Sequence, residues 1–403
     1  MSANPTTSSV REWEQAFLRK AWWLFPLGGV LASLAVGGPF WAWVEGKWMG
    51  PNWAQLAGVR AALWALAFAA IPAVWRIGLR IKRPFGWIWL AVAGTVLAAE
   101  CLLATPRVQA ALWLAARARL EGRQHFMREV CYVRLEEAAG RTAAGPAVVL
   151  VGSSQVLLGV DEHLLAAEQS LPVIRRAMFG MTPLRALSMR AYVPFRNQDR
   201  CVQYLSEFDF TNHDEFPFEW FRPYASWRTV PDVLRCVSGR VKLLRWRQVV
   251  DYALAATTEW WRARDFLRQI AFHFSGGERT EATEKAPPDL AAAAAKARGP
   301  LNFRAGEIAG FRQFARRLSE QGVELIVFEG GVNPAIDSED RRQAKRETRE
   351  MVAHFLAGGY GRYVPLEEQV LDLGPGDWFD MNHLGPTGRE KLTRRIAQEL
   401  STP

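Results

Sequence analysis

The chain has 403 residues, 49% of them hydrophobic, and its 50 Lys and Arg against 41 Asp and Glu give a formal net charge of +9. A basic chain can indicate nucleic-acid binding, but the Arg residues are scattered and no nucleic-acid motif occurs, so we expect no nucleic-acid partner. The apolar residues are concentrated before about residue 105, which predicts a membrane part followed by a globular domain.

Three apolar segments, at about 21–44, 59–75 and 85–105, each approach the roughly 20 residues that a helix needs to cross a bilayer. Trp residues gather near their ends, as in the aromatic belts of membrane proteins. The sequence therefore predicts a three-helix transmembrane anchor over 21–105, followed by a helical connector over 106–144.

The distribution of Lys and Arg predicts the orientation of this anchor. Basic residues occur in the polar segment 1–20 and in the second loop, around Arg76–Arg83, whereas the first loop carries only Lys47. The positive-inside rule then places segment 1–20 in the cytoplasm and the globular domain outside the bacterial plasma membrane, in the periplasm of a diderm cell. Basic residues at 117–123 oppose this orientation, and a two-span reading would reverse it.

From residue 145 to 403, strands alternate with helices, which predicts an α/β fold with a doubly wound, flavodoxin-like parallel sheet. The expected strands are a run ending at Ser154, then 172–179, 201–210, 323–328 and 360–364. The expected helices are 162–169, a long helical insertion over 231–273, 307–321, 339–357 and a final helix. A stretch rich in Gly, Pro and Ala at 275–300 is expected to be flexible.

Ser154 lies in a Gly-Ser-Ser turn directly after the apolar run 148–151. The carboxyl end of a strand in an open parallel sheet is where α/β proteins place their chemistry. Ser154 is therefore a candidate nucleophile, although such turns are also ordinary loops.

A serine needs a base, and the base needs a third group that holds it in the correct tautomer. Of the six histidines, His383 alone has a carboxylate three positions earlier, Asp380, on a loop expected at the end of the sheet. We therefore predict that Asp380 accepts from Nδ1 of His383, whose Nε2 faces Ser154. The backbone N–H groups of Ser154 and Gly180 are candidate oxyanion donors, with the amide of Asn212 or Asn333 as a third.

These residues resemble the motifs of the SGNH/GDSL hydrolase superfamily over about residues 145–400. The resemblance rests on Gly152-Ser153-Ser154, Gly180, and Asp380-Met381-Asn382-His383 before a Gly-Pro-Thr-Gly helix start. Its membrane-anchored branch, which includes D-alanyl transfer proteins and polysaccharide O-acetyltransferases, also has Gly-Ser-Ser, and residues 331–334 resemble that branch's Pro-Val-Asn turn. The superfamily's Gly-x-Asn-Asp block is not intact.

The resemblance implies an acyl-serine enzyme, an O-acyltransferase or esterase without a cofactor or metal, that acts on acetyl-like groups of an envelope or exported polysaccharide. Implied partners are that polysaccharide, membrane lipid and a multispanning acyl-exporting protein. Two alternatives remain open: a non-catalytic scaffold subunit of a polysaccharide export or modification complex, and a lipase for soluble substrates. The residues do not distinguish transfer from hydrolysis.

Other patterns allow more than one reading. The insertion 231–273, rich in Trp and Arg, could rest on the membrane, cover the site as a lid, or pack as ordinary helices. His213 with Asp214 and Glu215 could mimic a metal cluster, but matched ligands elsewhere are missing. Glu329 is expected to be structural rather than to contact substrate. The four cysteines contain no CxxC pair, and one disulfide is possible but not required.

Overall fold

The computed structural model describes residues 145–178, 180–193, 195–211, 222–264 and 302–401, with isolated residues between 12 and 27 and between 100 and 111. The chain divides into two compact units, Met1–Cys101 and Leu102–Pro403, and every element named below belongs to the second. Within the described residues, no helix combines the length and apolar character needed to cross a membrane. The predicted spans fall almost entirely outside those residues, as do most of the connector 106–144 and the stretch 275–300.

The centre of the second unit is a five-stranded parallel sheet in the order β2-β1-β3-β4-β5. The strands are β1 (Val148–Gly152), β2 (Val173–Ala177), β3 (Arg200–Leu205), β4 (Glu324–Glu329) and β5 (Arg362–Val364). The apolar runs of β1 and β4 are continuous rather than alternating because both faces of the sheet are covered. The α/β prediction is confirmed, and the strand order is one that doubly wound sheets use.

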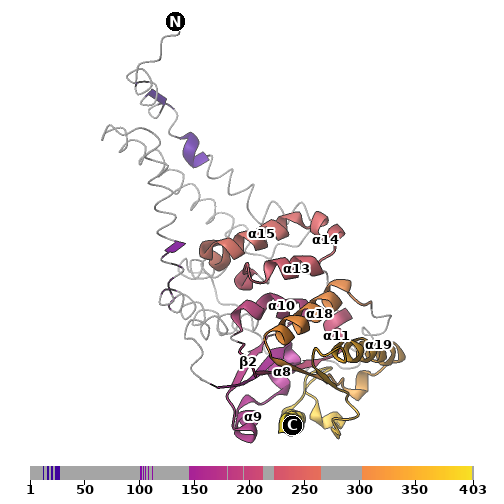
Figure 1. The fold of residues 1–403 in the computed structure, drawn as a ribbon. Helices are drawn as coiled ribbons and strands as arrows, with labels where there is room; N and C mark the ends of the chain where they lie inside the picture. The colour runs from indigo at the N-terminus through magenta and orange to yellow at the C-terminus, as the bar shows by residue number, and fades with distance from the viewer. Residues whose placement is uncertain are drawn as a thin grey trace. The chain divides into compact units, whose positions relative to one another are not determined.

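Helices cover the sheet on both faces (Figure 1). On one face lie α10 (Pro183–Met189), α18 (Ala305–Glu320) and α19 (Glu339–Leu356). On the other lie α8 (Ser154–Gly159), α9 (Glu162–Gln169) and α20 (Pro386–Ser401). Short 3-10 turns η1 to η4 occupy Arg190–Tyr192, Arg222–Tyr224, Pro334–Ile336 and Pro375–Asp377.

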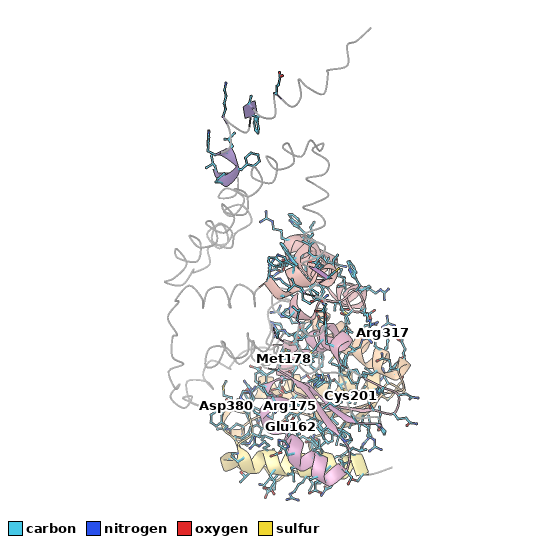
Figure 2. The ribbon with its side chains drawn as sticks, turned by 90° about the vertical axis from the view of Figure 1, so that its left-hand side faces the viewer. Glu162, Arg175, Met178, Cys201, Arg317 and Asp380 are labelled. Carbon is cyan, nitrogen blue, oxygen red and sulfur yellow. The ribbon has the colours of Figure 1, made fainter. Side chains whose placement is uncertain are left out.

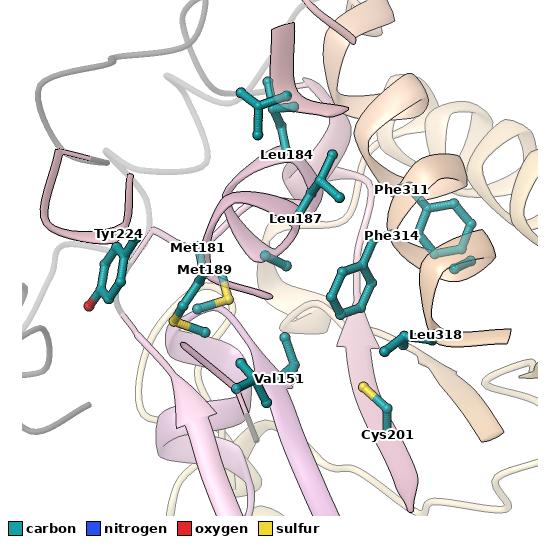
Figure 3. Packing of buried hydrophobic residues seen from close by; sticks show 14 of the residues in the cluster. Val151, Met181, Leu184, Leu187, Met189, Cys201, Tyr224, Phe311, Phe314 and Leu318 are labelled. Carbon is teal, nitrogen blue, oxygen red and sulfur yellow. The ribbon is translucent and has the colours of Figure 1, made fainter. Parts of the chain in front are cut away.

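The larger core lies between the sheet and the pair α10–α18 (Figure 3). Leu184 and Leu187 of α10 meet Phe311 and Phe314 of α18 there, and each of these side chains is at most 2% exposed. Burial of one such side chain contributes about 1.5–3 kcal/mol. The two helices approach closely at Gly310, where a Cβ atom would lie 2.7 Å from the Leu184 Cα, so a larger residue there would push the helices apart.

The described part of the predicted insertion is helical and is divided into separate helices. It forms α13 (Val230–Cys236), α14 (Gly239–Leu244) and α15 (Trp246–Thr257), stacked as a further layer over α10 and α18 (Figure 1). The Ser238 side chain accepts from the Val241 N–H at 3.2 Å and starts a new helix, and Arg245 leaves helical geometry between α14 and α15. These local breaks explain why a helical composition does not give a continuous helix.

Two other features differ from the sequence prediction. α8, which begins at Ser154, is an additional helix, because the first helix expected after β1 is 162–169. β3 ends at Leu205 instead of 210, because the Asp209 carboxylate accepts from the Ser206 N–H at 2.8 Å and turns the chain into α11 (Phe208–Thr211). By contrast, α9 has the predicted bounds, set by Asp161, whose side chain caps the first turn.

Candidate active site

The serine turn, residues 152–155, connects β1 to α8. Gly152 ends the strand where a Cβ atom would lie 2.4 Å from Val156 Cγ2, so the turn has no room for a side chain there. Ser153 is the N-cap of α8, and its hydroxyl accepts from the Gln155 N–H at 3.3 Å. Ser154 is the first helical residue, and such a residue has no intrahelical acceptor for its N–H. The half-buried Ser154 therefore presents both its hydroxyl and its N–H at the carboxyl edge of the sheet.

The histidine loop, residues 377–385, lies between η4 and α20. An isolated antiparallel bridge joins Trp378 to Leu384, and the Phe379 N–H donates to the His383 carbonyl at 2.8 Å. Within this hairpin, Oδ1 of Asp380 accepts from the N–H groups of Asn382 and His383 at 3.0 and 2.9 Å. The Asp-x-x-His spacing thus makes a closed turn that fixes the carboxylate beside its own histidine.

The structure brings the three predicted side chains into one hydrogen-bonded chain. Oδ2 of Asp380 lies 2.7 Å from Nδ1 of His383, and Nε2 of His383 lies 2.7 Å from Oγ of Ser154. An ionised carboxylate can only accept, so Nδ1 carries the proton and donates to Asp380. Nε2 is then the acceptor for the Ser154 hydroxyl, which is the arrangement that a general base requires.

Asp380 is held in its charged form. Partial burial by itself raises the pKa of this carboxyl, but hydrogen bonds from His383 and from the Asn382 N–H, together with the attraction of His383, outweigh burial and leave the pKa below its usual range. At neutral pH, Asp380 is therefore a carboxylate that can orient His383 and stabilise its protonated form. Figure 2 shows Asp380 toward one side of the domain and Arg317 toward the other.

Asn333 holds the histidine loop in place through hydrogen bonds to its backbone. Its Nδ2 donates to the Asp380 carbonyl at 3.2 Å, its N–H donates to the Met381 carbonyl at 2.9 Å, and its Oδ1 accepts from the Ala335 N–H at 3.0 Å. The sequence gives Asn333, or alternatively Asn212, as a candidate third oxyanion donor. In the structure the 3%-exposed side chain of Asn333 bonds to the backbone of the loop, and its role as an oxyanion donor stays a prediction.

Two further residues, which the sequence analysis did not identify, join the loop to the sheet. Gln155 donates from Nε2 to the Asn382 carbonyl at 3.3 Å and so connects the serine turn to the histidine loop. The buried Tyr204 hydroxyl accepts from the Gly331 N–H at 2.6 Å, and a Cβ atom at Gly331 would lie 3.0 Å from the Trp378 ring. No local sequence pattern marks either residue, because their partners are more than a hundred positions away.

Gly180 lies at the same edge of the sheet as Ser154. The Met178 N–H donates to the Gly152 carbonyl at 3.0 Å, which ties the end of β2 to the serine turn, and Gly180 follows two residues later with a φ of +66°. Arg185 donates to the Gly180 carbonyl, and buried Glu307 accepts from the Leu184 N–H at 2.9 Å. The loop after β2 is thus fixed in a left-handed geometry that favours glycine.

The other singled-out residues have separate positions. Asn212 and His213 lie outside the described residues. Glu329 is buried and pairs with Arg349 at 2.9 Å, and it accepts from the Leu366 N–H at 2.7 Å, so it has a structural role. Cys101, Cys201 and Cys236 are free thiols, and Cys131 lies outside the described part. Among the described residues, no three His, Cys, Asp or Glu side chains gather as a metal site would require.

Comparison with known proteins gives no match, either to a protein-family model or to a curated sequence.

Proposed function

We propose that the protein is a serine acyl-transfer enzyme, an O-acyltransferase or acyl esterase. The single observation that carries the proposal is the pair of 2.7 Å hydrogen bonds that link Asp380 to His383 and His383 to Ser154. A surface serine or an isolated histidine is common, but a serine, a base and an orienting carboxylate in this order and geometry are the parts of an activated nucleophile.

In the first step, Ser154 Oγ forms a bond to the acyl carbon of an ester while its proton passes to His383 Nε2. Asp380 stabilises the imidazolium that results. The ester C–O bond then breaks, and the departing alcohol takes the proton from Nε2, which leaves an acyl-serine. Water or a sugar hydroxyl next forms a bond to the acyl carbon and gives its proton to His383 Nε2. The bond between the acyl carbon and Oγ then breaks, and Oγ takes the proton from Nε2, which restores Ser154 and releases the carboxylic acid or the acylated sugar.

The negative oxygen of each tetrahedral intermediate needs fixed donors. The Ser154 N–H, at the start of α8, and the Gly180 N–H, after β2, are the two donors that we propose, because both lie at the carboxyl edge of the sheet. The third donor remains open, since Asn333 is engaged with the histidine loop and Asn212 lies outside the described residues.

The arrangement of these parts supports membership of the SGNH/GDSL superfamily. The serine follows β1, Gly180 follows β2, and Asp380 and His383 precede the last helix, in a sheet of order 2-1-3-4-5. The absence of an intact Gly-x-Asn-Asp block separates the chain from the superfamily's usual pattern, and the Asn333 contacts supply a support for the loop instead.

For the substrate, we propose acetyl-like esters of an envelope or exported polysaccharide, with the domain anchored on the outer side of the bacterial plasma membrane. The support is the three apolar segments within 21–105 and the excess of Lys and Arg in segment 1–20 and the second loop. An acyl group made in the cytoplasm would need a multispanning exporter, which is the partner class that this arrangement implies.

The test is intact-mass analysis of the full-length protein after treatment with a serine-directed fluorophosphonate. We expect one adduct, which Ser154→Ala abolishes and His383→Ala slows greatly. Ser153→Ala is the matched control, because it removes the neighbouring hydroxyl at a cost of about 1 kcal/mol for the lost cap and leaves the adduct in place. Absence of an adduct on the folded wild-type protein would overturn the enzyme proposal and favour the scaffold subunit.

A further inference from the structure

The helices α14 and α15 carry large apolar side chains on their solvent side. Leu243 and Leu244 at the end of α14 are 75% and 68% exposed, and Trp246 at the start of α15 is 56% exposed. Val250 and Leu254 continue the row at intervals of four residues. Residues four apart lie on one face of a helix, so the row extends about 12 Å along α15. We call these five residues the apolar row.

The apolar row is not the core-facing side of α15. Tyr252, Ala255 and Ala256 are buried on the opposite side, in the core shared with α10 and α18. A surface helix ordinarily turns a polar face to water once its apolar face is packed. α15 is apolar on both sides, and a contiguous exposed patch of this kind marks a contact surface.

The exposed charges of the segment that carries the row are of one sign. Within residues 222–264, the exposed charged side chains are all basic: Arg228, Arg235, Arg240 and Arg247. The acidic residues of this segment are turned inward, since Asp232 pairs with Arg317, Asp251 with Arg222, and Glu259 with Arg262. Arg247 lies over the Trp246 ring at 5.4 Å.

We propose that this surface lies on an anionic lipid bilayer, with the apolar row in the headgroup region and the arginines against lipid phosphates. Within residues 222–264, Trp and Leu occur among exposed Arg residues and no acidic residue is exposed, which is the composition of helices that bind in the membrane interface. A second copy of the chain fits poorly, because a two-fold contact would bring Arg240 and Arg247 of both copies together. The apolar row contains no residue of the candidate active site, so lipid binding there is independent of catalysis at Ser154.

The experiment places benzoylphenylalanine, a photoreactive residue, at Val250 or Leu254 of the full-length protein. The control position is Glu390, which is exposed on α20 over the opposite face of the sheet. Protein is combined with vesicles of equal parts phosphatidylcholine and phosphatidylglycerol, irradiated, and analysed by mass. We expect lipid adducts at 250 and 254 and none above background at 390.

Three further comparisons make the outcome decisive. Vesicles of phosphatidylcholine alone, or Arg240→Gln with Arg247→Gln, should remove most of the adduct, because both take away the charge attraction. Crosslinks to a second copy, crosslinks to other residues of the same chain, or equal yields at 250 and 390 would each overturn the proposal. Thermal unfolding of each sample, followed by circular dichroism, shows that the domain is folded. This readout does not depend on the proposed activity of Ser154.

Discussion

The serine turn and the histidine loop meet through two hydrogen bonds, the 2.7 Å bond between Ser154 and His383 and the 3.3 Å bond from Gln155 to Asn382, but they are held in place by different means. The serine turn is fixed locally: β1 ends at Gly152, Ser153 caps α8, and Ser154 is the next residue along the chain. The histidine loop has its own hairpin, but its position depends on contacts with residues far away in the chain, namely Asn333 and Gln155, the last residue of the serine turn.

This difference separates the two halves of the site in their response to mutation. Changes around the serine turn should act on local stability unless they remove the nucleophile itself. Changes to the distant supports of the histidine loop should act on reactivity, because the base must stay within hydrogen-bond reach of the hydroxyl. A misplacement of about 1 Å can lower the rate about 100-fold.

The largest effect is expected for Asp380→Asn. An asparagine Oδ1 can still accept from the N–H groups of Asn382 and His383, so the hairpin should remain closed. Its Nδ2 would face Nδ1 of His383, which favours the wrong tautomer and leaves Nε2 without a free lone pair for Ser154. We expect the fluorophosphonate labelling rate to fall by roughly 10³- to 10⁴-fold with little change in thermal unfolding. Labelling close to the wild-type rate would show that Asp380 does not orient the base.

The second largest effect is expected for Asn333→Ala, which removes a contact between the histidine loop and a distant part of the chain. Asn333→Ala removes the hydrogen bonds to the Asp380 carbonyl and from the Ala335 N–H, and we expect a loss of about 1–3 kcal/mol in the free energy of unfolding. At temperatures where the variant stays folded, labelling should slow by about 10- to 100-fold. Ser153→Ala, on the serine side, should lose about 1 kcal/mol with an almost unchanged labelling rate. Equal slowing in both variants would remove the distinction between the two halves.

The sequence predicted well those parts of the fold and the site that depend on residues close together in the chain. The continuous apolar run of β1, the Asp161 cap of α9 and the Asp-x-x-His spacing are all short-range signals, and the corresponding elements and contacts are present. The three side chains were expected together, and the structure joins them by hydrogen bonds.

The parts that sequence reasoning missed depend on contacts between distant residues. Asn333 was a candidate oxyanion donor because it follows a strand. Only the folded chain shows that its side chain donates a hydrogen bond to the Asp380 carbonyl. The end of β3, which was placed too late, is an exception, because the contact that ends the strand is local: the Asp209 carboxylate accepts from Ser206, three residues earlier, and turns the chain. Gln155 had no signal at all, since its partner is the backbone carbonyl of Asn382.

A third prediction concerns the pH dependence of stability, to which two carboxyls with opposite pKa shifts contribute. Burial raises the pKa of Asp209 to about 7 against its hydrogen bonds from Ser206, whereas the pKa of Asp380 lies below its usual range. A carboxyl whose folded pKa is raised keeps its proton when the unfolded chain has lost it. Its contribution to stability is therefore complete below about pH 4 and is lost as the pH rises to about 7. Asp380 contributes above about pH 4 and loses its contribution only in stronger acid.

We therefore expect Asp209→Asn to flatten the stability profile between about pH 4 and 7, by on the order of 3 kcal/mol, because the amide has no proton to lose. Urea unfolding at several pH values measures this. Glu307, whose pKa burial also raises to about 7, should leave a residual slope in the same direction. A slope unchanged in Asp209→Asn would mean that another group carries the dependence.

The smallest effect is expected at Phe379, which is 72% exposed although it sits next to Asp380. The backbone of Phe379 closes the hairpin through the His383 carbonyl, and Phe379→Ala preserves that bond. Exposed side chains of this kind change stability by no more than about 0.5 kcal/mol, and a small fluorophosphonate should label the variant at the wild-type rate. A loss of labelling as large as that of Asn333→Ala would mean that the exposed face of the histidine loop, rather than its buried supports, controls the reactivity of Ser154. The two halves of the site would then have to be distinguished by exposure rather than by the range of the contacts that hold them.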